Sequence, residues 1–145
     1  MIKPEDLRIG DYVRVSSDNC MIPKGAVCKV VAIDSERACE DKKGLAGLLQ
    51  LDREEWEISH GIWSDCIEGI LITPEILEKN GFEMREDTIV YAKNRLSLKP
   101  LDDEKGYQVG LGSLRFFYVK VKIVKYVHEF QHILWALGED ANLKI

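Results

Sequence analysis

The sequence predicts an α+β protein, and three observations lead to this fold class. Short β-branched runs recur between turns that contain Gly, Asp or Asn, which is typical of antiparallel strands. Thr73-Pro74-Glu75 has the composition of a helix start, because Thr caps helices and Pro is tolerated at the first helical position. Over residues 126–137 the apolar side chains recur at steps of three and four, which predicts a C-terminal helix.

Residues 1–72 are predicted to form a small antiparallel β-barrel of the SH3-like kind. The first strand contains Val13 and Val15 on one face, and a turn at Gly10-Asp11 precedes it. The run at 26–33 is β-branched with weak alternation, which favours a strand covered on both faces. Further apolar runs lie at 45–51 and 66–72. Several short strands in so short a segment favour a barrel.

Residues 73–145 are predicted to form a second α+β module. A short helix begins at Pro74 and ends at Asn80-Gly81, because Gly adopts the left-handed conformation that ends many helices. Strands are then expected at 82–85, 88–92, 95–98, 107–111 and 116–124, in the order of an antiparallel meander. The closing helix ends at Gly138, and we expect Leu134 to lie in the core because it belongs to the apolar stripe.

The last predicted strand, residues 116–124, carries the candidate binding site. Strict alternation would turn Phe117, Val119, Val121 and Ile123 toward the core. The candidate binding residues on the opposite face, or beside it, are Arg115, Phe116, Tyr118, Lys120 and Lys122. Aromatic side chains stack on bases and cations contact phosphates, so the set suits nucleic acid. The alternative is that the lysines protect an exposed strand from pairing with another chain.

The sequence His128-Glu129-Phe130-Gln131-His132 matches H-E-x-x-H, in which two histidines bind zinc and the glutamate acts as general base. The extended form of the motif fails, because Trp135 and Gly138 stand where a glycine and a third histidine belong. A catalytic zinc needs three protein ligands. We therefore predict no metal, no cofactor and no catalytic residue, and we expect that the two histidines do not bind zinc together.

Composition restricts the class of protein further. A net charge of -5 disfavours nucleic-acid binding over the whole surface and leaves room only for a local basic patch. No apolar run has the length of a membrane helix, and the N-terminus lacks the apolar region of a signal peptide, so a cytoplasmic location is expected. In the cytoplasm thiols stay reduced, and no C-x-x-C pair occurs among Cys20, Cys28, Cys39 and Cys66.

The three tryptophans are expected to fill a core or to line an interface: Trp56, Trp63 and Trp135.

Three segments resemble a family of short uncharacterised proteins from gut bacteria and their prophages: LRIGDYV at 7–13, ITPEILEKNGF at 72–82 and VKIVKYVHEFQHILWAL at 121–137. His128 matches the pattern of that family, which has Gln in place of Glu129 and Asn or a similar residue in place of His132. The resemblance implies no activity. It implies a phage-related or mobile-element accessory protein.

The leading hypothesis is a non-enzymatic binding or adaptor module. A protein partner is favoured, and nucleic acid is the other partner considered. The alternative from a different class is a zinc-dependent hydrolase that uses His128, Glu129 and His132.

Overall fold

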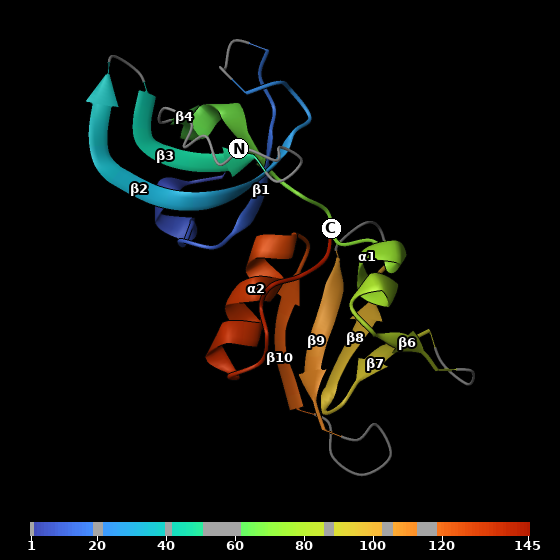
Figure 1. Cartoon of the computed structure of the whole chain (residues 1–145). Helices are drawn as coiled ribbons and strands as arrows, with labels where there is room; N and C mark the ends of the chain where they lie inside the picture. Colours follow the sequence, from blue (N-terminus) through green and yellow to red (C-terminus); the bar gives the residue numbers. More distant parts are fainter. Residues whose placement is uncertain are drawn as a thin grey trace. The chain divides into compact units, whose positions relative to one another are not determined.

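A computed structural model describes residues 2–18, 22–39, 42–50, 62–85, 89–102, 106–112 and 119–145. The chain forms two compact units, Met1–Ile70 and Leu71–Ile145, where the sequence predicted a boundary between residues 72 and 73 (Figure 1). Each unit contains one five-stranded sheet whose paired strands are antiparallel. Both α-helices of the described residues belong to the second unit. The predicted α+β class is therefore confirmed.

The N-terminal unit consists of η1 (Pro4–Asp6), β1 (Tyr12–Val15), β2 (Val27–Cys39), β3 (Lys42–Gln50), β4 (Ile62–Trp63), η2 (Ser64–Cys66) and β5 (Ile67–Gly69). Its strands lie in the order β4-β3-β2-β1-β5. On β1, Val13 and Val15 are fully buried, as their alternation predicted. They belong to an apolar core that also contains Cys28 and Val30 of β2.

The sheet of the N-terminal unit is not closed into a barrel over the residues that the structure describes. Its outer strands, β4 and β5, each pair with one neighbour. The strand that begins near residue 26 is longer than predicted and forms a long hairpin with β3, with register shifts between Val30 and Ala32 and between Asp34 and Ala38. Such irregularities bend and twist a strand, and their positions depend on the partner strand. An SH3-like arrangement of this unit stays a prediction.

The C-terminal unit consists of α1 (Pro74–Lys79), β6 (Glu83–Met84), β7 (Tyr91–Lys93), β8 (Leu96–Pro100), β9 (Tyr107–Leu111), β10 (Val119–Val124) and α2 (Val127–Ala136). Its strands lie side by side in chain order, which confirms the predicted meander. In register, Tyr91 lies opposite Leu98, and Leu98 lies opposite Val109. All three are buried, so they mark the core face of the sheet.

Helix α2 packs over this unit with its apolar stripe buried. The rings of Phe130 and Phe82 meet edge to face with their centroids 5.7 Å apart. Leu134 is buried as predicted, and it lines the same cavity as Leu96 of β8. Gly138, at a φ of 70°, follows the helix and lets the amide of Glu139 donate to the carbonyl of Leu134 at 2.9 Å.

Helix α1 begins as the sequence predicted. The hydroxyl of Thr73 accepts a hydrogen bond from the amide of Ile76 at 3.4 Å, and Pro74 occupies the first turn. Gly81 follows the helix at a φ of 77°.

In the described part of the chain, no helix has both the length and the apolar composition needed to cross a membrane.

The segment after α2 folds back onto the C-terminal unit. Ala141 and Leu143 are buried, and the side-chain amide of Gln131 donates to the carbonyl of Ala141 at 3.0 Å. The side chain of Asn80 pairs with the backbone of Lys144 in both directions: its Nδ2 donates to the carbonyl and its Oδ1 accepts from the amide, each at 2.8 Å. These contacts hold residues 139–145 against the end of α1.

Candidate functional site

Strand β10 does not bury the face that the sequence predicted. Val119, Val121 and Ile123 are 62%, 41% and 52% exposed, and of the strand's residues only Val124 is buried. A β-bulge also breaks the alternation of the strand: Lys120 lies opposite Gly110, whereas Lys122 lies opposite Val109, and Val121 is the extra residue. Consecutive residues of β9 face opposite sides of the sheet, so the bulge turns Lys120 and Lys122 to opposite faces. The prediction that the aliphatic side chains of this strand face inward is therefore wrong.

The predicted binding residues divide into two groups. Arg115, Phe116 and Tyr118 lie outside the described residues. Lys120 and Lys122 are exposed on β10, which is the outermost strand of its sheet and pairs with β9 alone among the described strands. We call the five residues 119–123 the β10 edge surface. It combines three aliphatic and two cationic side chains with the backbone of an edge strand.

Glu129 has a structural role at the start of α2. Its Oε2 accepts hydrogen bonds from the amides of Lys125 at 2.7 Å and Tyr126 at 3.0 Å. This is the carboxylate half of a capping box, in which a glutamate in the first turn satisfies backbone donors that have no partner within the helix. The group that the hydrolase hypothesis requires as general base therefore caps the helix.

The two histidines of the motif lie in a row of rings along α2. His128 is buried and stacks on Tyr126, with centroids 5.8 Å apart and an angle of 12° between the planes. His132 stacks on the exposed Trp135 at 6.3 Å and 8°, and the two imidazoles meet edge to face at 6.1 Å. Among the described residues, no group of three or more His, Cys, Asp and Glu side chains could hold a metal ion.

The remaining residues selected from the sequence belong to the N-terminal unit. Trp63 is half-buried against the core of that unit, and Cys28 and Cys66 are buried in that core. Trp56, Cys20 and the side chain of Cys39 lie outside the described residues. The described thiols therefore belong to the core.

Two tyrosines of the C-terminal sheet have shifted acidities. Tyr91 and Tyr107 are buried and meet edge to face at 6.3 Å. Burial raises the pKa of Tyr91 above its usual value, and the negative charges of Glu78 and Glu75 raise it further. Burial also raises the pKa of Tyr107, with smaller contributions from Tyr91 and Glu75. In contrast, the pKa of Glu75 is lowered, mainly by a side-chain hydrogen bond with Thr73.

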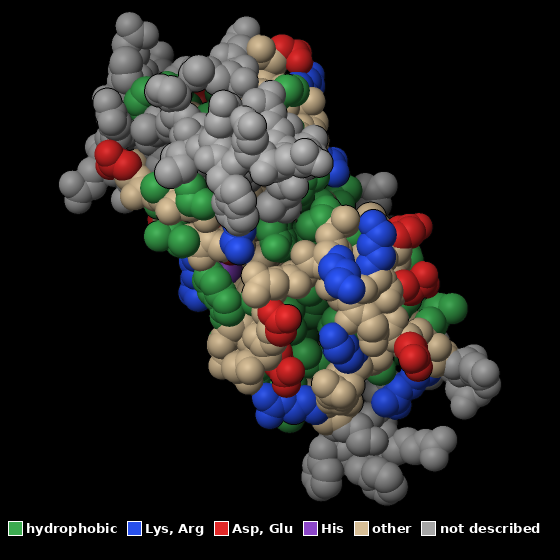
Figure 2. All heavy atoms as spheres, in the orientation of Figure 1, with side chains coloured by type: hydrophobic (Ala, Val, Ile, Leu, Met, Phe, Trp, Pro, Cys, Tyr) green, Lys and Arg blue, Asp and Glu red, His purple; other side chains and the backbone are tan. Residues whose placement is uncertain are grey.

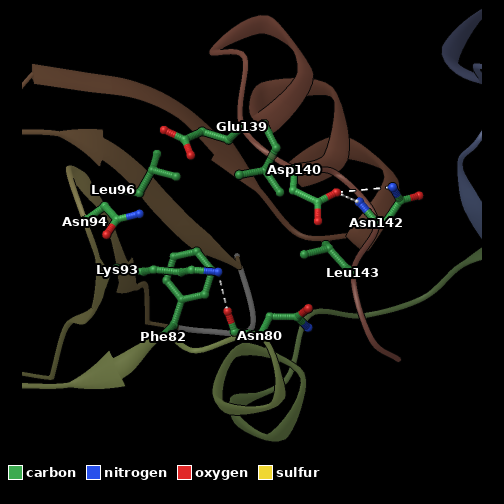
Figure 3. A pocket seen from close by; sticks show the side chains of 10 residues that line it. Asn80, Phe82, Lys93, Asn94, Leu96, Glu139, Asp140, Asn142 and Leu143 are labelled. Carbon is green, nitrogen blue, oxygen red and sulfur yellow. Dashed lines mark hydrogen bonds between the residues drawn. The ribbon is translucent and has the colours of Figure 1, made fainter.

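A cavity of about 170 Å³ lies between the β7–β8 turn, the end of α1 and the segment after α2 (Figure 3). We call it the tail pocket. Its apolar lining consists of four buried side chains: Phe82, Leu96, Leu134 and Leu143. Its polar lining consists of Asn80, Lys93, Asn94, Glu139, Asp140 and Asn142. On the face drawn in Figure 2, acidic and basic side chains are interspersed over the C-terminal unit.

The charged side chains of the tail pocket differ in their partners. Glu139 forms an ion pair with Arg95 at 3.3 Å, and Arg95 also donates to the carbonyl of Leu137 at 2.9 Å. Lys93 donates to the carbonyl of Asn80 at 2.7 Å, and its ammonium lies 5.6 Å from the centre of the Phe82 ring. The Oδ1 of Asp140 accepts from the backbone and side-chain amides of Asn142 at 2.9 and 3.2 Å.

No sequence pattern predicted the tail pocket, because residues 139–145 carry no periodic pattern. Comparisons with known proteins give no match: no family model, no curated protein and no solved structure is significantly similar to this chain.

Proposed function

We propose that this chain is a non-enzymatic binding module that receives an extended segment of a protein partner along β10. The observation that carries the proposal is the β10 edge surface, in which an outermost strand leaves five of its six residues exposed. An edge strand offers backbone donors and acceptors to another strand, and side-chain positions along it give specificity.

The apolar content of the strand favours binding over simple protection. Lysines alone would protect an edge from pairing with another chain. Here Val119, Val121 and Ile123 add exposed β-branched side chains on a strand only six residues long. Burying such side chains stabilises strand pairing, because cross-strand aliphatic contacts remove apolar surface from water.

The charges select an acidic partner. Lys120 and Lys122 are both exposed, and opposite charges across paired strands attract. A second copy of the chain fits less well, because its own β10 edge surface carries two lysines and no acidic side chain. Like charges directly opposite each other are destabilising. Since the bulge turns Lys120 and Lys122 to opposite faces, the partner segment is extended and carries acidic and aliphatic side chains on both of its faces.

The wider biological setting is part of the proposal and rests on the resemblance to prophage-encoded proteins alone. An accessory protein of a phage or mobile element, acting through a protein partner, agrees with a binding module. The hydrolase alternative would need Glu129 as a general base, whereas the carboxylate of Glu129 caps α2.

The test uses a fluorescent synthetic peptide in which pairs of glutamates alternate with pairs of valines, so that both faces of the extended peptide carry glutamate, together with a matched peptide that has lysine in place of glutamate. We expect the acidic peptide to bind at low salt and to shift the amide resonances of residues 119–123. The variant Lys120→Glu/Lys122→Glu should lose the acidic peptide and bind the basic one. The control Lys99→Glu changes an exposed lysine of β8 and should bind like the parent chain.

Three outcomes would overturn the proposal. The first is that neither peptide shifts the β10 amides. The second is binding of a single-stranded oligonucleotide that the double charge reversal abolishes, which would assign the surface to nucleic acid. The third is a concentration-dependent dimer that the same reversal abolishes, which would assign the surface to a second copy.

A further inference from the structure

We propose that the tail pocket binds a small zwitterion, an α-amino acid with an aliphatic side chain. The pocket and the β10 edge surface share no residue, so this inference stands apart from the proposed function. Three features of the pocket support it: two complementary charges, a fixed ammonium group, and an apolar lining of the right size.

The first feature is a cation and an anion that line one cavity without pairing. Lys93 reaches the tail pocket from β7, and Asp140 reaches it from the segment after α2 (Figure 3). Among the described residues, neither side chain forms an ion pair, whereas Glu139 is paired with Arg95. A ligand that carries both a carboxylate and an ammonium group would pair both charges. A ligand with one charge would leave the other unpaired.

The second feature is that Lys93 is already held in place. Its side chain lies beside Gly81, where an added Cβ would be 3.7 Å from Cε, and its ammonium contacts the Phe82 ring and the Asn80 carbonyl. An ammonium group has three donors, and one of them is used by Asn80. The other two are available for a ligand carboxylate. Fixing the group in advance lowers the entropy lost on binding.

The third feature is the size and character of the lining. The cavity of about 170 Å³ is close to the roughly 150 Å³ that holds one benzene molecule. Four buried apolar side chains form the interior, and the polar side chains are exposed or half-buried at its rim. An aliphatic side chain of three or four carbons, on an amino acid head group, matches this division. L-Leucine and L-valine are therefore the first ligands to test.

The experiment separates the two charges chemically. Amide resonances of the full chain are followed while L-leucine, isocaproate or isoamylamine is added; isocaproate lacks the ammonium group of leucine, and isoamylamine lacks its carboxylate. We expect leucine to shift the amides of residues 93–96 and 139–143, and each analogue to bind about tenfold more weakly or worse.

Matched variants assign the charges to residues. Lys93→Gln should weaken leucine binding about tenfold and leave the weak binding of isoamylamine unchanged, whereas Asp140→Asn should weaken leucine and spare isocaproate. The control Lys99→Gln removes an exposed lysine outside the pocket and should bind leucine like the parent chain. The inference is overturned if leucine leaves the pocket amides unmoved, if isocaproate binds as well as leucine, or if Lys99→Gln weakens binding as much as Lys93→Gln.

Discussion

Replacing Leu134 by alanine should destabilise the C-terminal unit by about 2.5–3.5 kcal/mol. Leu134 is 3% exposed, so the substitution removes three carbon atoms from a buried site. At ~0.8 kcal/mol for each buried carbon, the lost transfer free energy is about 2.4 kcal/mol. A closed core would add a further cost for the empty space, and such substitutions cost ~2–5 kcal/mol overall. Here the new space joins the tail pocket, which water can enter, so we expect the lower half of that range.

The assay is urea denaturation followed by tryptophan fluorescence, with Trp56 and Trp63 replaced by phenylalanine. Trp135, on α2, then reports on the C-terminal unit alone. The matched control is Leu71→Ala, because Leu71 is 51% exposed in the same unit and should lose less than about 1 kcal/mol. A loss below about 1 kcal/mol for Leu134→Ala, or a loss equal to that of the control, would refute the packing of this helix face.

Three other predictions test local features. Glu129→Ala should destabilise the chain by about 0.5–2 kcal/mol in the same assay, because α2 loses its cap; unchanged stability would contradict the capping role. Gly106→Ala should lower the free energy of unfolding more than Gly138→Ala. Both glycines have a positive φ, which costs an alanine ~1–3 kcal/mol of strain, but only at Gly106 would the added Cβ meet the backbone of Val124. Equal losses of stability for the two variants would be inconsistent with this contact. Tyr91 and Tyr107 should ionise above pH 10.0 in absorbance titrations, because burial raises the pKa of both. The raised pKa keeps both side chains neutral in the folded state, so the stability of the fold should decrease as the pH rises above 10.0. Ionisation of both tyrosines at pH 10.0 would contradict their burial.

The helices could be predicted because their signals are local. Thr73 and Pro74 begin α1 through contacts within one turn, and Gly138 ends α2 through its own φ. The strands of the C-terminal meander follow each other in the sheet, so the chain order alone fixes their neighbours. Such features need no knowledge of distant residues.

The candidate site on β10 could be located from the sequence, but its geometry and the whole of the tail pocket could not be predicted, because they depend on distant residues. The bulge in β10 arises from its register with β9, and the alternating sequence of β10 carries no sign of it. Without the bulge, Val119, Val121 and Ile123 would share one face of the sheet. In the same way, residues 139–145 form a wall of the tail pocket only because Asn80 and Gln131 bind their backbone. The spacing of His128 and His132 could be recognised in the sequence. The hydrogen bonds that Glu129 accepts from the amides of Lys125 and Tyr126 could not.

The pairing of Asn80 with Lys144 affects the order in which the protein can fold during synthesis. The two residues are 64 positions apart, so these hydrogen bonds close a long loop. The C-terminal unit cannot complete this contact until Lys144 has left the ribosome. The N-terminal unit has no such requirement, since its sheet uses residues up to Gly69. A nascent chain therefore exposes an unfinished second unit while the first can already be folded.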